Sequence, residues 1–255
     1  MSPIQTLRII TVLCGLCCQL FSLNVLSNTS PLTPPIVLEN DFTAIHSLPW
    51  VRYFEDTHGT KDTQHIFSLD QNLWQTSTDT PLNFGFSNST FWFNFSLENQ
   101  SQALQELYIH LDYALLDDIR VYHVIGNKLV QKYESGDHLP FGERPVDFPT
   151  FLFPISLDTN TDSEVYIRIA SQGTVQAPIS VWDKDFFLLD SHSFLFLYGC
   201  FLSAMLIMSA YNFCLFLTIR DKNYFLYSLF ILLPTGAHSS LDGFAYHGFW
   251  PALPE

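Results

Sequence analysis

The chain has 255 residues, of which 47% are hydrophobic and 14% charged, and its formal net charge is −14. Residues 28–193 account for this balance, because they hold 22 acidic and 8 basic residues. An acidic chain lacks the clustered Lys and Arg with which proteins bind nucleic acid or anionic lipid. The acidity keeps this part of the chain soluble and leaves room for a neutral or cationic ligand.

The first segment, residues 1–27, is typical of a secretory signal peptide. Arg8 precedes an apolar run from Ile9 to about Leu26, and Ser27 is a small residue suitable for cleavage, although the A-x-A pattern is absent. Cleaved or retained, the segment exports the residues that follow. The exported part contains no cysteine, and its roughly 165 residues are enough to bury a core without disulfides.

The exported part shows apolar residues at every second position, which is the period of half-buried β-strands. Turn sequences rich in Gly, Asn, Asp and Ser separate these runs. Weaker runs at 50–55 and 177–182 bring the total to about seven to nine short strands, without a convincing amphipathic helix. We therefore expect a mainly β domain, a jelly roll or β-sandwich. The five clear runs are 91–97, 107–111, 119–121, 151–155 and 165–169.

The opposite faces of these strands carry aromatic rings beside Arg and Asp. Rings stack on the apolar face of a sugar, while guanidinium and carboxylate groups bind its hydroxyls, so these faces suit a carbohydrate. The alternative is that loops or the segment 36–60 cover the rings and form a second small core. The outward-facing residues are Trp92, Tyr108, Asp112, Arg120, Tyr122, Tyr166, Arg168 and Trp182.

A membrane hairpin follows the β domain. Phe194–Ile219 is a run of 26 residues without a charge, and as a helix it is about 39 Å long, enough to cross a bilayer. Arg220 and Lys222 precede a second apolar run from Tyr224, so the positive-inside rule places this turn in the cytoplasm. The predicted organisation is a signal peptide at 1–27, a β-sandwich at 28–190, a linker and transmembrane helix at 191–219, a cytoplasmic turn at 220–223, a second transmembrane helix at 224–242 and an extracytoplasmic tail at 243–255.

Four stretches of the sequence together resemble one receptor family. They are LDYALLDDIRVYHV from residue 111, SGDHLPFGERPVDFPTFLFPIS from 135, VYIRIASQGTVQAPISVWDKDFF from 165 and YGCFLSAMLIMSAYNFCLFLTIRDKNYFLYSLF from 198. In this order they resemble the type 2 extracellular domain and first two helices of bacterial seven-transmembrane receptors with diverse intracellular signalling modules. The resemblance covers roughly residues 36–251.

The resemblance implies a periplasmic jelly-roll sensor that binds carbohydrate-like ligands. It also implies a bacterial inner-membrane location and a coupling through seven helices to a cytoplasmic output module. The sequence stops at Glu255, after the second apolar run. We therefore expect a fragment or truncated form of such a receptor.

Three polar residues in the matched loops are further ligand candidates: Asp137, Arg144 and Gln172, held among Gly and Pro residues. Each is equally suited to fixing its loop by hydrogen bonds or by an Asp–Arg pair. The adjacent Asp117 and Asp118 could ligate calcium, but adjacent acids at a strand start are more often solvated. We predict no metal and no cofactor.

No nucleophile elbow, zincin helix, Walker loop or dinucleotide fingerprint occurs in the sequence. We therefore expect no catalytic residues and no enzyme. The leading hypothesis is an extracytoplasmic sensor that binds a carbohydrate or other small ligand and is tethered to the lipid bilayer. The alternative is a structural or interaction module that docks a second copy or another signalling subunit. A hydrolase with paired carboxylates would need a cleft that sequence spacing does not indicate.

Overall fold

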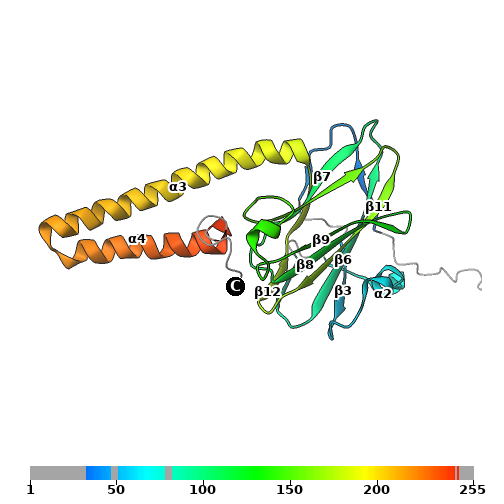
Figure 1. The fold of residues 1–255 in the computed structure, drawn as a ribbon, viewed down its shortest axis with the longest axis horizontal. Helices are drawn as coiled ribbons and strands as arrows, with labels where there is room; N and C mark the ends of the chain where they lie inside the picture. The colour runs from blue at the N-terminus through cyan, green and yellow to red at the C-terminus, as the bar shows by residue number, and fades with distance from the viewer. Residues whose placement is uncertain (1–32, 47–50, 78–81, 245, 247–255) are drawn as a thin grey trace, which may run out of the picture. The chain divides into compact units, whose positions relative to one another are not determined.

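The computed structural model describes residues 33–46, 51–77, 82–244 and 246, so the predicted signal peptide lies outside the described residues. Within them, two β-sheets are followed by two long helices (Figure 1). A seven-stranded sheet has the order β4-β3-β6-β11-β8-β9, with β1 paired to β6, and a four-stranded sheet has the order β10-β7-β13-β2. β12 and β5 form a separate pair. The prediction of a mainly β domain ahead of a helical hairpin is confirmed.

The strands come from the alternating runs of the sequence. All five clear runs form strands, while the weaker run at 177–182 is divided at Pro178 between two strands. The strand bounds are Ile36–Leu38 (β1), Ala44–Ile45 (β2), Arg52–Asp56 (β3), Gln75–Thr76 (β4), Leu82–Phe86 (β5), Thr90–Asn99 (β6), Gln105–Leu111 (β7), Asp118–Ile125 (β8), Lys128–Ser135 (β9), Phe151–Leu157 (β10), Asp162–Ala170 (β11), Thr174–Ala177 (β12) and Ile179–Asp183 (β13).

The main core lies between the two sheets. Phe93 and Ile167 face inward from the larger sheet, and Ile109, Phe153 and Val181 face inward from the smaller one, all of them fully buried. Antiparallel registers align these positions, for example Ile167 with Phe93 and Phe153 with Ile109. Because side chains alternate along each strand, the remaining residues of these strands face outward from both sheets.

Short helical segments cover part of the larger sheet. They are α2 (Thr63–Phe67) and the turn η1 (Gln71–Leu73). Another short helical segment, η2 (Phe141–Glu143), lies elsewhere, in the loop before β10. Asp62 caps α2 by accepting a hydrogen bond from the backbone N–H of His65. These elements were not predicted, because one or two helical turns are too short to show a helical period.

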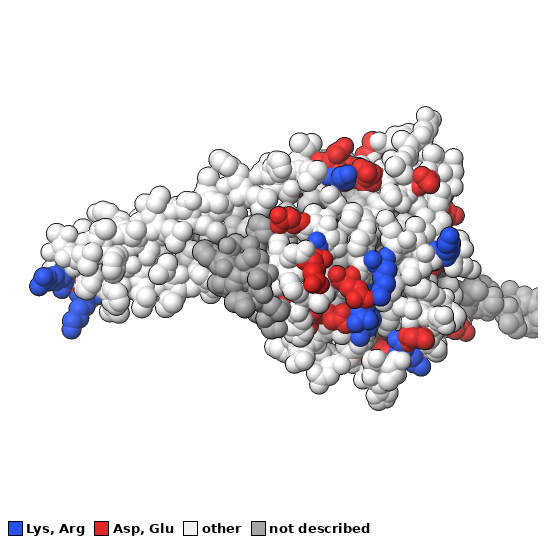
Figure 2. Space-filling view, in the orientation of Figure 1, with Lys and Arg blue, Asp and Glu red and all other residues white. Residues whose placement is uncertain are grey.

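The hairpin consists of α3 (Lys184–Ile219) and α4 (Lys222–Leu241), which run side by side (Figure 1). Among the described helices, only α3 is both long and apolar enough to cross a membrane by length and composition. Ser209 and Ser228 hydrogen-bond across the pair, with their Oγ atoms 3.0 Å apart. On the face seen in Figure 2, charged side chains lie at the turn of the hairpin, and the lengths of the two helices that adjoin it show none. The sequence places Arg220 and Lys222 at this turn.

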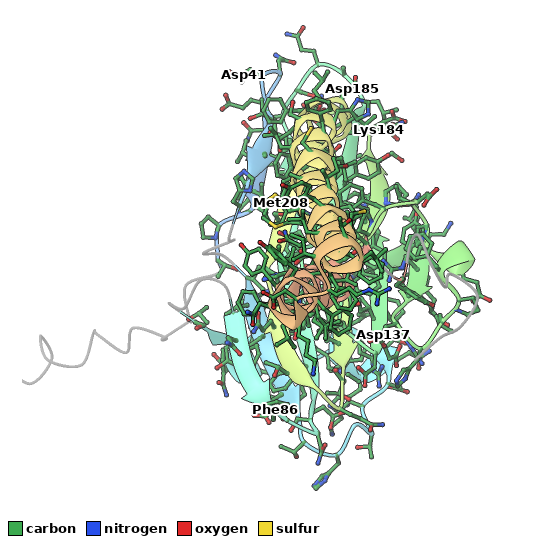
Figure 3. The ribbon with its side chains drawn as sticks, turned by 90° about the vertical axis from the view of Figure 1, so that its left-hand side faces the viewer. Asp41, Phe86, Asp137, Lys184, Asp185 and Met208 are labelled. Carbon is green, nitrogen blue, oxygen red and sulfur yellow. The ribbon has the colours of Figure 1, made fainter. Side chains whose placement is uncertain are left out.

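The helix α3 begins ten residues before the predicted apolar span. The Asp183 carboxylate caps it by accepting the backbone N–H of Phe186 at 2.9 Å. The segment expected to be a linker is therefore helical and continuous with the span. Figure 3 shows Lys184 and Asp185 at this start and Met208 further along the same helix. A continuous helix is stiffer than an irregular linker.

Candidate functional site

The outer face of the larger sheet is not an open trough. Trp92, Tyr122 and Tyr166 are buried there, and Trp92 is only 1% exposed. Phe67 from α2 and Trp74 pack against Tyr166 at ring distances of 4.7 Å and 6.2 Å. In this structure the three rings have little surface on which a sugar could stack. They are covered, as in the alternative, but the cover comes mainly from residues 63–74 and not from 36–60.

Charged residues on the same face are paired with each other. The Arg120 Nε donates to Asp118 at 3.2 Å, and Arg168 donates to the second oxygen of the same carboxylate. The side chain of Arg120 is 39% exposed and that of Arg168 17%. A ligand would have to compete with Asp118 for both guanidinium groups. The structure therefore gives these two predicted residues an intramolecular role.

The outer face of the smaller sheet is covered by α3 itself. Phe187 packs edge-on against Tyr108 at 5.7 Å and against Trp182 at 5.4 Å. Both rings are less than a tenth exposed, and the Trp182 Nε1 donates to Ser180 Oγ at 2.9 Å. Tyr108 was predicted to contact ligand, and this packing makes it part of a second core instead. Trp182 also lines the cavity described below.

The predicted loop residues Asp137 and Gln172 belong to a network around Asp117. One oxygen of the Asp117 carboxylate accepts from Ser171 Oγ at 2.7 Å and the other from the backbone N–H of Gln172 at 2.8 Å. The backbone N–H of Asp137 donates to the carbonyl of Leu116 at 2.9 Å. These bonds fix the loops, as the alternative prediction has it.

Asp117 and Asp118 do not form a joint calcium site, because their carboxylates bind separate partners. Asp117, Asp137 and His138 do offer ligand atoms within 4.8 Å of one another. Both oxygens of Asp117 already accept hydrogen bonds, from Ser171 Oγ and from the backbone N–H of Gln172. We therefore assign no metal to this group.

Arg144 is buried rather than available to a ligand. Its Nη1 donates to the carbonyls of Phe148 at 3.2 Å and Pro149 at 2.7 Å. Its guanidinium lies 4.5 Å from the ring of Phe141 and 5.5 Å from that of Tyr246. Burial lowers the pKa of Arg144 to about 10, which leaves it charged at neutral pH. In this arrangement Arg144 presents little surface to a ligand, because its Nη1 donates within the 141–149 loop and the side chain is buried.

The same loop holds the chain that follows α4. The Tyr246 hydroxyl donates to the carbonyl of Leu139 at 2.8 Å, and its ring meets Phe141 edge-on at 5.6 Å. Gly243 has φ +79°, and a Cβ there would lie 2.4 Å from the Pro149 carbonyl oxygen. The end of α4 is thus packed closely onto the β domain through residues that are far apart in the sequence.

A cavity of about 730 Å³ lies between the β domain and the outer ends of the two helices, and we name it the junction cavity. Its volume is within the usual range for small-molecule sites, about 300–1,000 Å³. The β domain contributes two loops and the side chains of His110 and Trp182, and the helices contribute the opposite wall. The lining residues are His110, Asp112, Tyr113, Ala114, Leu115, Phe148, Pro149, Thr150, Trp182, Phe187, Asp190, Ser191, Phe194, Tyr198, Leu241, Asp242 and Phe244.

Polar groups of the cavity wall are held in place by one another. His110 Nε2 is 2.8 Å from Thr150 Oγ1 and 3.7 Å from the Asp112 carboxylate. Burial lowers the pKa of His110 to about 4, so the imidazole is neutral at neutral pH. The Tyr198 hydroxyl donates to Asp242 at 2.7 Å and joins the outer ends of α3 and α4. The Asp112 side chain is 67% exposed and free to meet a ligand.

Of the eleven predicted ligand residues, Asp112 and Trp182 line the junction cavity. The other nine lie in covered faces, ion pairs or loop networks. Sequence reasoning missed His110, Phe148, Phe194 and Asp242. His110 lies near the end of β7, and the alternation of this strand predicts only that its side chain faces outward. The others meet only through tertiary contacts between segments far apart in the chain.

Solved structures similar to this chain share low sequence identity with it. They include a Bacillus thuringiensis Cry1Da tryptic core variant (10% identity, TM-score 0.30) and a family 35 carbohydrate-binding module from Clostridium thermocellum (7%, TM-score 0.27). CsCBM6-3 from Clostridium stercorarium, in complex with cellobiose, has 9% identity and a TM-score of 0.25. The likeness covers 60%, 55% and 59% of this chain and 25%, 98% and 98% of those chains, respectively. These likenesses are too distant to indicate a ligand.

No curated protein matches the chain. Two family models do, in the order of the elements described above. The model for the 7TMR-DISM extracellular 2 domain matches residues 48–183, more than half of the chain and nearly all of the β domain. The model for the 7TM diverse intracellular signalling region matches residues 194–255, which include most of α3 and all of α4. The chain therefore belongs to the family of seven-transmembrane receptors with diverse intracellular signalling modules, and it carries their extracellular 2 domain ahead of the membrane region.

Proposed function

We propose that this chain is the ligand-sensing portion of its receptor and that it binds a carbohydrate-like ligand in the junction cavity. The observation that carries the proposal is the cavity itself, which is walled by the β domain on one side and by α3 and α4 on the other. A ligand in this position contacts the sensor domain and the helices that lead into the membrane at the same time.

The chemistry of the wall supports a sugar. Aromatic rings from Phe194 and Phe244 offer apolar surface on which a pyranose can stack, and the Asp112 carboxylate can accept hydrogen bonds from its hydroxyls. Asp112 comes from the β domain, Phe194 from α3 and Phe244 from the segment after α4. Binding would therefore draw three separate parts of the chain together.

Coupling to the membrane follows from the attachment of the two helices. α3 continues directly from β13, while the end of α4 is held by Tyr246 and Gly243 on the loops at 139–150. A ligand shifts a conformational equilibrium only by its difference in affinity for the two states. The walls of this cavity are attached to different helices. If α3 and α4 move relative to each other, the cavity changes shape and its affinity for the ligand changes with it.

The proposal places the β domain in the bacterial periplasm and the hairpin in the inner membrane. The proposal keeps the predicted signal peptide at 1–27 and the predicted sensor domain at 28–190, with the membrane region after it. The last residues of this sensor domain form the start of α3. We propose that this portion acts by binding and not by catalysis. Any enzymatic output would belong to an intracellular module.

The test is isothermal titration of the full chain in lipid nanodiscs against a panel of sugars and glycosides. Phe194→Ala should weaken binding about threefold to tenfold, the range expected for loss of one aromatic contact. Phe86→Ala is the matched control, because Phe86 is 85% exposed and lies outside the cavity (Figure 3). Absence of binding across the panel would instead favour a structural module that docks a second copy or another subunit.

A further inference from the structure

The described wall of the junction cavity is negatively charged. Three carboxylates line it, those of Asp112, Asp190 and Asp242, and no Lys or Arg is among its lining residues. Asp112 comes from the loop after β7, Asp190 from α3 and Asp242 from the end of α4. Carboxylates from three separate elements therefore converge on one cavity.

The neighbouring basic groups offset this charge only in part. His110 is neutral at neutral pH, because burial lowers its pKa to about 4, although the Asp112 charge acts in the opposite direction. Arg144 lies behind the wall, where its Nη1 donates to the Phe148 and Pro149 carbonyls. Lys184 is paired with Glu106 at 2.8 Å.

One of the three carboxylates already has a hydrogen-bond donor. Asp242 accepts the Tyr198 hydroxyl at 2.7 Å, and this neutral donor leaves its negative charge in place. Asp112 has only the His110 imidazole beside it, at 3.7 Å. Asp190 lies on the exposed side of α3. A neutral sugar could donate hydrogen bonds to these carboxylates, but it would not balance the charge of the wall.

The aromatic rings of the wall favour a cation for a second reason. The face of an aromatic ring is the negative part of its quadrupole, so ammonium groups bind over it. Phe148, Trp182, Phe194, Tyr198 and Phe244 all line the cavity. Carboxylates and rings together, without a competing basic side chain, are the combination with which proteins bind organic ammonium ions.

We propose that the ligand of the junction cavity carries a positively charged amine on a carbohydrate-like frame, that is, an amino sugar. This inference rests on the proposed function, because it assigns the chemical class of ligand to the same cavity. Asp112 and Asp190 act as the specificity-determining residues for the amine. Their side chains are exposed, so replacing them by Asn preserves the fold.

The experiment compares glucosamine, N-acetylglucosamine and glucose by titration on the full chain in nanodiscs. The three sugars share one ring, and only glucosamine carries a charged amine at neutral pH. Glucosamine should bind about tenfold more tightly than the other two, which corresponds to one partly exposed cation–π or ion-pair contact. Added salt should reduce this preference, because it screens exposed charges.

The Asp112→Asn and Asp190→Asn double variant should abolish the preference, so that within this variant glucosamine binds no more tightly than glucose. The matched control is Asp158→Asn. Asp158 is exposed and follows Leu157, at the opposite end of β10 from Thr150. It should keep the full preference of the unaltered chain.

The outcomes separate the two proposals. Equal or tighter binding of the neutral sugars overturns the amine inference and leaves the sensor proposal in place. Ethanolamine, titrated in the same way, has an amine without the sugar frame. If it binds as tightly as glucosamine, the result supports the amine but overturns the carbohydrate frame. If neither these three sugars nor the wider panel binds, both proposals are overturned. An unchanged preference in the double variant also overturns the inference, because the amine would then be bound elsewhere.

Discussion

Replacing Gly243 by Ala should detach the end of α4 from the β domain. Gly243 has φ +79°, a conformation that costs a non-glycine residue about 1–2 kcal/mol. The new methyl group would lie 2.4 Å from the Pro149 carbonyl oxygen and 3.0 Å from the Ala114 Cβ. Overpacking of this kind costs about 1–3 kcal/mol. Together the two effects weaken docking by about 2–5 kcal/mol.

Two other glycines provide controls that separate these effects. Gly126 also has a positive φ, +54°, but a Cβ there meets nothing within 4 Å, so Gly126→Ala has only the backbone cost. Gly236 lies inside α4 with open space around it. Gly236→Ala should therefore stabilise the helix slightly, by up to about 1 kcal/mol. Neither control should disturb the loops that meet α4.

The assay is hydrogen–deuterium exchange of the full chain in nanodiscs, followed in peptides that cover residues 113–115 and 139–150. Gly243→Ala should raise exchange in both peptides, because loss of docking exposes the backbone of these loops. The same variant should weaken sugar binding, since one wall of the junction cavity moves. Unchanged exchange, or the same change in Gly126→Ala, would refute the reasoning about docking.

Three further predictions concern other parts of the chain. Gly136→Ala should destabilise the β domain by more than Gly126→Ala does in chemical denaturation, because its Cβ would lie 1.9 Å from the Asp117 carbonyl oxygen. The free energy of unfolding should fall as pH falls from about 6.5 to 4, since the folded pKa of His110 lies below its unfolded value and the unfolded chain takes up the proton first. His110→Gln should flatten this pH dependence, and an unchanged curve would contradict it. A double-mutant cycle of Ser209→Ala and Ser228→Ala should give a coupling of about 0.6 kcal/mol, whereas Thr218→Ala, which removes a bond within α3, should show no coupling to Ser228.

Most of the β fold could be predicted because its signal is local. Period-two alternation identifies which side chains share a face, and the inward set, such as Phe93, Ile109 and Ile167, is the set buried between the sheets. The strand β9 was missed, because its outward and inward residues are both largely exposed and give no apolar alternation. The start of α3 was missed because the apolar span was taken as the helix, although Asp183 is a suitable cap.

The candidate site could be predicted only in small part, because its contacts are long-range. The sequence shows that Trp92 and Tyr122 face outward, but not that Phe67 and Trp74 cover them. The partner of Arg168 is 50 residues away, and the hydroxyl that binds the Leu139 carbonyl is 107 residues away. Asp112 and Trp182 were identified by their residue type and face, and the remainder of the cavity depends on how the helices meet the loops.

The packing of α3 over the smaller sheet explains how a ligand in the junction cavity would act on the membrane helices. The outer rings Tyr108 and Trp182 are buried by Phe187, which belongs to the same helix as the apolar span. Moving α3 away from the sheet would expose these rings, and fully exposing one large side chain costs about 1.5–3 kcal/mol. We expect the β domain and α3 to move together, whereas the described contacts between α4 and the β domain gather around Gly243 and Tyr246. α4 is also joined to α3, through Tyr198–Asp242 and Ser209–Ser228. Because the junction cavity lies where both helices meet the β domain, the proposed function predicts that its occupant changes the position of the outer end of α4.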